Sequence, residues 1–327
     1  VGEMGRESGA TSYRAGWVAV CAAPLPSMAA FAVLRGCAGG AGEGAACAAF
    51  LGAPLLALNV FVLFNFTVGL WLHSLFARST WLVDAYWTLT PVLIHAFFRN
   101  HPDAAHSRRG DLVTVLLYAW CLRLSCNYWR RESWSPGRRE DWRFAAMRAA
   151  HGRFWPFTSF FVAYASQHLM LVGLALPLRT VYRAPATPLN ACDALAALVC
   201  AAGLAVGRRA DLELAAYSAA PRRPKVLDSG LWRLCRHPNH LGEQVWWVGV
   251  SLFAVSAGGA WPDALGFLFN HVLDTCGTLP LIRTRMLARP QRAHDYAAYM
   301  HQTPLVYPTA ASVQRWWTQP RPGGKTS

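Results

Sequence analysis

Charged residues are scarce in this chain. They make up 15% of its 327 residues, against about 25% in soluble globular proteins. This scarcity excludes a disordered chain and disfavours an ordinary soluble enzyme. Hydrophobic residues reach 54%, the mean hydropathy is +0.21, and tryptophan, which gathers at lipid–water boundaries, occurs 15 times. The composition therefore predicts an all-α, polytopic helical membrane protein with about seven or eight transmembrane helices.

Two further patterns are missing. The nine cysteines form no CxxC pair and mostly lie in apolar runs, which favours buried reduced thiols over a disulfide scaffold. No G-x-G-x-x-G motif follows a strand, so a Rossmann domain is not expected. Any nucleotide cofactor would have to bind to another kind of site.

The apolar runs predict eight helices, each near the roughly 20 residues that cross a bilayer core. We expect one integral-membrane domain over 17–309, after a short segment at 1–16 and before a flexible, Pro/Gly-rich tail at 310–327. The first helix is the weakest, because Pro24 and Pro26 interrupt it. The predicted helices are 17–34, 54–77, 80–98, 111–128, 157–178, 188–206, 241–257 and 260–282.

Lysine and arginine concentrate in three connections. Segments 129–156, 208–240 and 283–327 carry seven each, whereas the connections on the opposite side carry three or fewer. The positive-inside rule places these segments and both termini in the cytosol, with the endoplasmic reticulum membrane expected in a eukaryote. The net charge of +14 thus follows from topology, and we expect the bilayer rather than nucleic acid as a partner. Protein partners are not predicted.

The densest polar cluster lies at 207–243 and ends in RHPNHLGE. A solvated basic loop accounts for its arginines but not for this ending. Asn239 can cap a helix, Pro238 and Gly242 shape the start of that helix, and a carboxylate at Glu243, entering an apolar run, is costly without a partner. Basic groups beside a helix N-terminus predict a phosphate site.

A metal site is the alternative for the same segment. His237 and His240 are three residues apart with Cys235 nearby, but Pro238 separates them and no second ligand cluster has a familiar spacing. We therefore predict no metal.

Two other polar clusters stand out. Asp84 lies inside a predicted span, and Arg123 is its predicted partner; the pair is either functional or a structural lock between two helices. The segment DYAAYMHQTPLVYP at 295–308 places Tyr296 and Tyr299 on one helical face. Alone it indicates only an interfacial amphipathic helix.

Together these segments resemble a known family. GLWRLCRHPNHLGE at 230–243 resembles the GLW-R-x-x-RHPNY-x-GE element of membrane proteins related to steroid 5-alpha-reductases. That superfamily also includes sterol reductases and, distantly, isoprenylcysteine methyltransferases. The resemblance covers roughly 80–310. Its other elements appear in order in WLVDAYWTLTPV at 81–92, LRLSCNYWRR at 122–131, EDWRFAAMR at 140–148 and the segment 295–308.

The resemblance implies an NADPH-dependent reductase that saturates a carbon–carbon double bond of a steroid, sterol or related lipid. Asp84 and Tyr128 are predicted to polarise the lipid carbonyl, and the lipid is expected near Asp84, Trp87, Arg123 and Asn127. The cofactor candidates, carried over from matching motif positions, are Asp211, Lys225, Arg236, His237, Asn239, Glu243 and Tyr296.

The chain departs from the family pattern at two places. His240 replaces the usual tyrosine after HPN, and Arg283 and Thr284 stand where many relatives carry acidic residues. Two alternatives therefore stay open. One is an S-adenosylmethionine-dependent methyltransferase of the isoprenylcysteine type, and the other is a non-enzymatic lipid-binding or assembly protein that retains the fold.

Overall fold

The computed structural model describes residues 13–38 and 44–318. Every regular element within these two ranges is helical, which confirms the predicted all-α class. The chain forms two compact units: unit 1 comprises Val1–Leu189 and Ala254–Gly266, and unit 2 comprises Asn190–Phe253 and Phe267–Ser327. The single domain over 17–309 stays a prediction.

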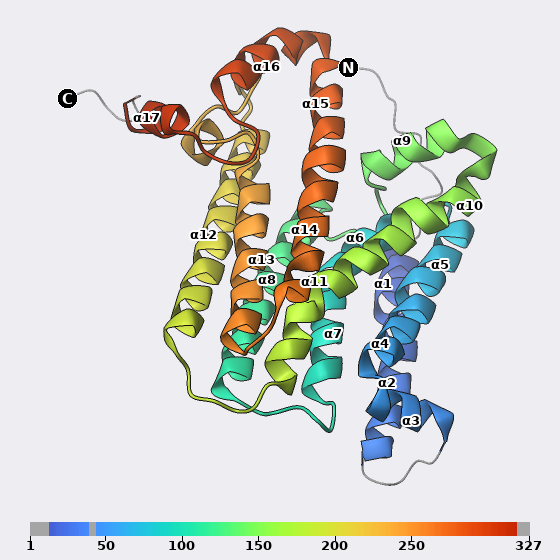
Figure 1. Cartoon of the computed structure of the whole chain (residues 1–327). Helices are drawn as coiled ribbons and strands as arrows, with labels where there is room; N and C mark the ends of the chain where they lie inside the picture. The colour runs from blue at the N-terminus through green and yellow to red at the C-terminus, as the bar shows by residue number, and fades with distance from the viewer. Residues whose placement is uncertain (1–12, 39–43, 319–327) are drawn as a thin grey trace. The chain divides into compact units, whose positions relative to one another are not determined.

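Unit 1 contains most of the shorter helices, coloured blue to light green in Figure 1. Among them, η1 and η3 are π-helical segments, and η2 and η5 are 3₁₀ turns. The elements are α1 (Tyr13–Ala22), α2 (Leu25–Ala38), α3 (Ala45–Gly52), α4 (Pro54–Val62), η1 (Leu63–Gly69), α5 (Leu70–Ala77), α6 (Trp81–Trp87), α7 (Leu89–Arg99), α8 (Arg108–Arg131), α9 (Trp142–His151), η2 (Gly152–Phe154), α10 (Trp155–Ser159), η3 (Phe160–Ala165), α11 (Ser166–Arg183) and η5 (Trp261–Ala264).

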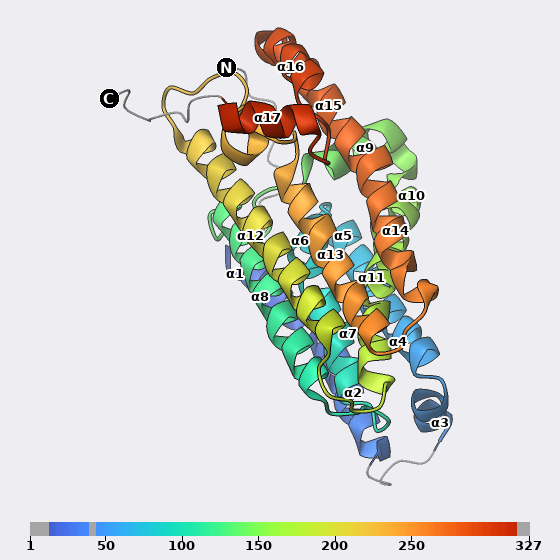
Figure 2. The ribbon, with the colours of Figure 1, turned by 60° about the vertical axis from the view of Figure 1, so that its left-hand side comes forward.

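Unit 2 is built on two long helices, α12 and α13, which run side by side in Figures 1 and 2. Its elements are α12 (Ala191–Ala219), η4 (Gly230–Arg233), α13 (Pro238–Ser256), α14 (Leu265–Val272), η6 (Leu273–Thr278), α15 (Leu279–Leu287), α16 (Pro290–Gln302) and α17 (Ala310–Thr318); α13 and α14 each extend a short way into unit 1.

Five helical stretches of the described residues are long and apolar enough to cross a membrane, by length and composition. They agree with five of the eight predicted spans, and helices α6 to α8 and α13 occupy the places of the other three. The composition and the helix lengths are therefore those of an integral membrane protein. The five stretches are Tyr13–Cys37, Pro54–Ala77, Trp142–Arg183, Ala191–Ala219 and Trp261–Leu287.

Several boundaries differ from the sequence predictions; the helix predicted at 188–206, for example, continues as α12 to Ala219. The span predicted at 80–98 is broken at Thr88, between α6 and α7, because Pro91 in the first turn of α7 suits the start of a new helix. Helix α17 occupies 310–318, part of the predicted flexible tail, and the remaining residues of that tail lie outside the described ranges. At the other end α1 begins at Tyr13, inside the predicted segment 1–16.

The prediction that all cysteines are reduced is wrong for one pair. Cys37 and Cys47 form a disulfide across ten residues, which joins the end of α2 to α3. Neither belongs to a CxxC pair, so spacing gave no signal. The other seven cysteines are free thiols, as predicted.

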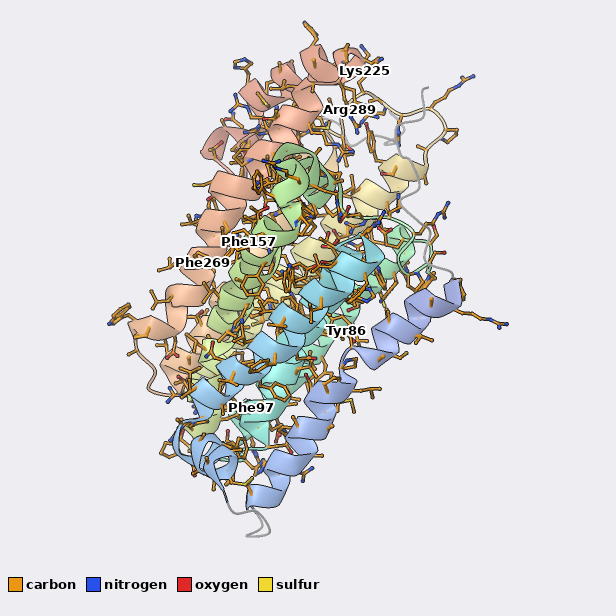
Figure 3. The ribbon with its side chains drawn as sticks, turned by 90° about the vertical axis from the view of Figure 1, so that its right-hand side faces the viewer. Tyr86, Phe97, Phe157, Lys225, Phe269 and Arg289 are labelled. Carbon is orange, nitrogen blue, oxygen red and sulfur yellow. A yellow bond between two sulfur atoms is a disulfide. The ribbon has the colours of Figure 1, made fainter. Side chains whose placement is uncertain are left out.

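The core of unit 1 combines aromatic packing with several buried polar side chains that are hydrogen-bonded to each other. The phenol of Tyr86, labelled in Figure 3 with Phe97, donates to the carbonyl of Val20 at 2.5 Å. Deeper in the unit, His168 joins Thr67 at 2.9 Å and Asn59 at 3.2 Å. Because buried polar groups destabilise a fold unless they are paired, these contacts fix α1, α4 and α11 within the unit.

In unit 2, helices α12 and α13 meet through glycine. A methyl group built on Gly242 would lie 2.5 Å from the backbone nitrogen of Gly207, and one on Gly203 would lie 2.6 Å from that of Trp246. Gly203 and Gly207 form a G-x-x-x-G pattern, which allows close backbone approach between helices in membranes. This contact fixes the start of α13, where the RHPNHLGE segment lies.

Candidate functional site

The GLW part of the 230–243 motif holds the chain in place. Gly230 has a positive φ of 58°, and the carboxylate of Glu213 accepts from the N–H of Leu231 at 2.9 Å. The indole of Trp232 donates to the carbonyl of Ala210 at 3.2 Å, and the buried phenol of Tyr299 donates to the carbonyl of Trp232. These contacts tie the loop to α12 and α16, so this part of the motif has a structural role.

The segment after 303 closes over the same loop. The backbone N–H of Arg236 donates to the carbonyl of Pro304 at 2.9 Å. From α17, the guanidinium of Arg315 donates to the carbonyl of Arg233 at 2.9 Å and also to the hydroxyl of Thr303. The closing motif and the RHPNH segment therefore form one local structure within unit 2.

In this structure, besides Nε of Arg233 and Nε of Arg315, five side chains within 236–244 and at Tyr296 have buried polar atoms without a hydrogen-bond partner. Three of the five side chains involved are nearly closed off from solvent: Gln244 is 2% exposed, Tyr296 is 4% exposed and His237 is 6% exposed. Native proteins leave few such groups unpaired, and each costs about 1–3 kcal/mol. The atoms are Nε and Nη1 of Arg236, Nε2 of His237, Oδ1 of Asn239, Oε1 of Gln244 and the hydroxyl of Tyr296.

In this polar group, the rings of His237 and Tyr296 are neutral and lie near the positive charge of Arg236. Burial, followed by the charges of His240 and Arg236, lowers the pKa of His237 to about 3, so its imidazole is neutral at pH 7. Burial raises the pKa of Tyr296, against the opposing effect of Arg236 and Arg283. The group can therefore donate to an anion through Arg236 and exchange hydrogen bonds with uncharged polar atoms through the other side chains.

His240 has a partner that sequence reasoning missed. Its Nδ1 lies 2.8 Å from Oδ1 of Asp274, in the π-helical segment η6, and Gln244 donates to the same carboxylate at 3.4 Å. Asp274 lies in the predicted span 260–282, so a carboxylate inside an apolar run was the available signal. His240, the residue that departs from the family pattern, is thus held by a hydrogen bond to a carboxylate.

The other predicted cofactor residues lie in different settings. Lys225 is exposed and pairs with the exposed Asp295 at 3.0 Å; Figure 3 shows Lys225 near the same end of unit 2 as Arg289. Asp211 lies on α12, and Glu243 lies one turn after Asn239 on α13. Arg236, His237, Asn239 and Tyr296 are therefore the predicted residues that belong to the unpartnered polar group.

Unit 1 brings together the two predicted catalytic residues. The hydroxyl of Tyr128, on α8, donates to the carbonyl of Trp81 at 3.5 Å. Asp84 lies close enough to Tyr128 for its charge to influence this phenol. The charges that act on Asp84 are those of Asp141, Arg143, Arg131 and Glu132. A pairing of Asp84 with Arg123 stays a prediction.

Much of the surrounding ED-x-R element is structural. Glu140 accepts from the N–H and the hydroxyl of Thr80, at 2.7 and 2.8 Å, and so caps α6. Asp141 caps α9 by accepting from the N–H of Arg143 at 2.8 Å, and it also pairs with that residue's guanidinium. These carboxylates hold the two helix starts that surround Asp84.

The predicted substrate residues are distributed along two helices of unit 1. Trp87, at the end of α6, donates from its indole to Gln167 at 3.0 Å. Arg123 and Asn127 lie one turn apart on α8. No three His, Cys, Asp or Glu side chains of the described residues form a group that could hold a metal ion.

Comparison with known proteins agrees with this arrangement of motifs. A family model described as "Protein of unknown function (DUF1295)" matches residues 70–303, which is more than half of the chain. The chain belongs to this family. The "Uncharacterized protein C594.04c" of Schizosaccharomyces pombe is 28% identical over 221 residues, 60% of this chain and 64% of that protein. The chain thus spans less than two thirds of that relative's length, and no solved structure matches it.

Proposed function

We propose that this protein is a membrane oxidoreductase that uses NADPH to reduce a carbon–carbon double bond of a steroid, sterol or related lipid. The observation that carries the proposal is the group of buried, unpartnered polar atoms of Arg236, His237, Asn239, Gln244 and Tyr296. The resemblance of the surrounding motifs to those of steroid 5-alpha-reductase-like proteins supports the choice of cofactor.

The unpartnered atoms fit the chemistry of a nicotinamide dinucleotide. Arg236 offers a guanidinium suited to a phosphate, and the neutral His237 offers a further ring nitrogen. Asn239 and Gln244 can hold a carboxamide or a ribose hydroxyl, and Tyr296 can donate to either. S-adenosylmethionine carries no phosphate, but its carboxylate is also a partner for a guanidinium, so Arg236 alone does not separate the two cofactors and the titration below does.

The reaction needs little more from the protein than binding and polarisation. When bound, NADPH would supply a hydride to one carbon of the double bond, and a proton taken up by the other carbon from solvent completes the saturation. In unit 1, the resemblance assigns Tyr128 and Asp84 to polarise the carbonyl oxygen of the lipid as negative charge develops there, which requires the Tyr128 hydroxyl to leave the carbonyl of Trp81. Residues 236–244 hold the cofactor and exclude water.

Two neighbouring tyrosines on α16 give the sharpest test. Tyr296→Phe removes a hydroxyl that has no partner in the free protein, so we expect unchanged or higher thermal stability and a Kd for NADPH raised about five- to thirtyfold. Tyr299→Phe removes the donor to the carbonyl of Trp232, so we expect it to lower stability by about 1 kcal/mol and leave affinity nearly unchanged in the folded fraction.

Calorimetric titration and thermal unfolding of purified protein measure both effects. S-adenosylmethionine is titrated in parallel. If it raises the unfolding temperature and NADPH does not, the methyltransferase alternative replaces our proposal. If neither cofactor raises the unfolding temperature, the result favours the non-enzymatic alternative.

The disulfide supports the proposed orientation in the membrane. Cys37 and Cys47 lie in the connection 35–53, on the side opposite the three basic segments, and disulfides persist in oxidising compartments. We propose that both termini and the basic segments face the cytosol, with the endoplasmic reticulum membrane as the location in a eukaryotic cell.

Cysteine labelling tests this orientation. In a background with the exposed Cys21 and Cys276 changed to serine, Ala145→Cys, Arg222→Cys and Ala310→Cys are expected to react with an impermeant maleimide from the cytosolic side. Asp103→Cys, in the exposed turn after α7, is expected to react from the opposite side. Labelling of Asp103→Cys from the same side as the other three contradicts the orientation.

A further inference from the structure

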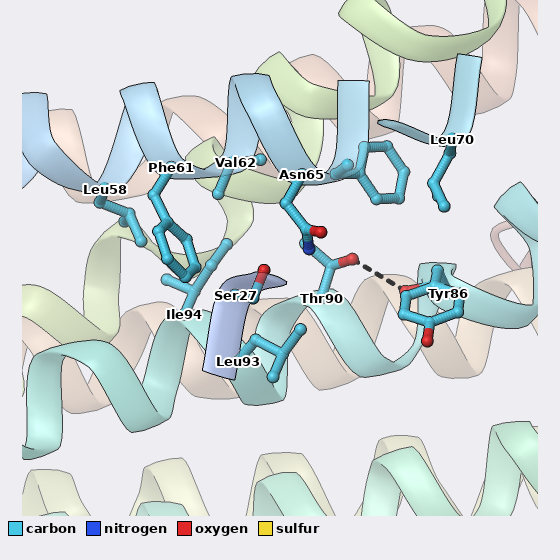
Figure 4. Close-up of a pocket in the computed structure, with 11 residues that line it drawn as sticks. Ser27, Leu58, Phe61, Val62, Asn65, Leu70, Tyr86, Thr90, Leu93 and Ile94 are labelled. Atoms are coloured by element: carbon cyan, nitrogen blue, oxygen red, sulfur yellow. Dashed lines mark hydrogen bonds between the residues drawn. The ribbon is translucent and has the colours of Figure 1, made fainter. Parts of the chain in front are cut away.

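Unit 1 contains a cavity that no predicted site residue lines. It has a volume of about 680 Å³ and is bounded by α1 and α2 on one side and by α3, α4, η1 and α5 on the other. A smaller pocket, drawn in Figure 4, adjoins it, and the two share Ser27, Phe61, Asn65 and Leu70. The volume is that of a site for one small ligand, typically about 300–1,000 Å³.

The cavity is lined mainly by apolar side chains, many of them small, and by no charged side chain. Seven of its residues are alanine, which leaves the space between the helices open. No Asp, Glu, Lys or Arg side chain belongs to the wall, and its polar side chains are those of Ser27, Asn65 and His73. Because a charged group placed here would lose its hydration without gaining a counter-ion, the occupant is neutral and mostly apolar.

Two polar atoms in this wall are buried and unpartnered. The hydroxyl of Ser27, a residue 3% exposed, and Nε2 of His73 have no hydrogen-bond partner. The neighbouring hydroxyl of Thr90 donates to the carbonyl of Tyr86 at 2.9 Å and forms no hydrogen bond with Ser27. Ser27 therefore needs a partner from within the cavity.

Asn65 faces Ser27 from the other side of the same space. Figure 4 shows its carboxamide beside Thr90 and across from Ser27. It lies in the π-helical segment η1, a type of irregularity that is frequent at functional sites. A hydroxyl or carbonyl of a ligand placed between Ser27 and Asn65 can accept from one and, if a hydroxyl, donate to the other.

We propose that this cavity binds one neutral lipid with a compact, sterol-sized apolar body and a single hydroxyl or carbonyl group, which Ser27 and Asn65 receive. The apolar wall accounts for affinity, and the polar pair fixes the orientation of the lipid. This binding site stands without the proposed reduction, because its wall contains neither Asp84 nor Tyr128, at which the proposed function places the carbonyl of the substrate.

Photolabelling tests the site in the purified full-length protein without NADPH. The probe is a diazirine–alkyne analogue of a monohydroxy sterol, with the labelled residues found by peptide mass spectrometry. We expect labelling on α2, α4 or η1, and competition by the unlabelled sterol. The matching sterane hydrocarbon, which lacks the hydroxyl, and the anionic sterol sulfate are each expected to compete at least about five times more weakly.

Matched alanine variants separate the cavity from the outer lipid surface. Ala30 lines the cavity and the adjacent Ala29 is exposed outside it, so Ala30→Phe is expected to reduce saturable labelling at least about tenfold and Ala29→Phe to leave it unchanged. Ser27→Ala is expected to weaken sterol competition about five- to thirtyfold and to leave competition by the hydrocarbon unchanged.

The outcomes that overturn the proposal are distinct. Equal competition by sterol, hydrocarbon and sulfate refutes recognition of a neutral polar lipid. Labelling confined to other helices, or equal effects of the two phenylalanine variants, refutes the cavity as the site. If Ala30→Phe does not fold, the competition series on the wild-type protein still decides. Saturable labelling in a protein that fails to bind NADPH keeps this site and removes the reductase proposal.

Discussion

Replacing Gly242 with alanine is expected to unfold unit 2, although the change adds a single methyl group. The new Cβ would lie 2.5 Å from the backbone nitrogen and 2.7 Å from the Cα of Gly207, and 2.8 Å from the carbonyl oxygen of Gly203. These are backbone atoms in the middle of α12, so no side chain can rotate away. We expect a loss of about 3 kcal/mol or more in the free energy of unfolding, at the upper end of overpacking effects.

Thermal unfolding and size-exclusion chromatography of the detergent-purified variant measure this loss. Gly277→Ala is the control, because a Cβ at Gly277 meets nothing within 4 Å, and alanine favours a helix over glycine by up to about 1 kcal/mol. The two glycine-to-alanine changes should therefore act in opposite directions. A Gly242→Ala protein with wild-type stability would falsify the close contact between α12 and α13.

This prediction also divides the motif at 230–243 into parts with different roles. Gly242 and Gly230 belong to the scaffold, since one allows helix contact and the other adopts a positive φ. Arg236, His237 and Asn239 carry the unpartnered atoms. The sequence alone does not separate the scaffold residues of this motif from the binding residues, because the two groups differ in which of their atoms have hydrogen-bond partners after folding.

The fold class could be predicted because bilayer-length apolar runs combined with a low charge content are typical of helical membrane proteins and rare in soluble folds. The break at Thr88 had a signal in Pro91, but the π-helical segments η1, η3 and η6 had none, since they arise from packing rather than from a particular residue. The disulfide between Cys37 and Cys47 depends on how α2 and α3 meet, which residue spacing does not determine.

The site was predicted in part for similar reasons. Arg236, His237, Asn239 and Tyr296 were found because motif positions carry them. Asp274 was missed because it lies 34 residues from His240 and the two meet only when η6 packs beside α13. The cavity at Ser27 was missed because alanine-rich walls look like ordinary lipid-facing helix in a sequence.

Replacing Arg236 should weaken cofactor binding more than replacing any other residue of the polar group. Its Nε and Nη1 are buried without a partner, whereas its backbone N–H bonds to Pro304 and is unaffected by substitution. We expect Arg236→Met to raise the Kd for NADPH about ten- to 150-fold at low salt, which corresponds to hydrogen bonds from a charged group. Because methionine keeps the apolar part of the side chain and removes the unpartnered Nε and Nη1, the thermal stability of the free protein should stay equal or rise.

Arg222 provides the matched control, since it is exposed in the same basic connection. Arg222→Met removes the same charge from the loop. If the basic segment attracts NADPH only by its total charge, the two variants should lose equal affinity. Salt, which screens exposed charges beyond ~8–10 Å, should then abolish both losses. A specific phosphate contact predicts a large loss for Arg236→Met that persists at about 0.5 M salt and at most about a threefold change for Arg222→Met. Titration of NADPH into both variants at two salt concentrations decides between the two, and equal losses would move the phosphate site away from Arg236.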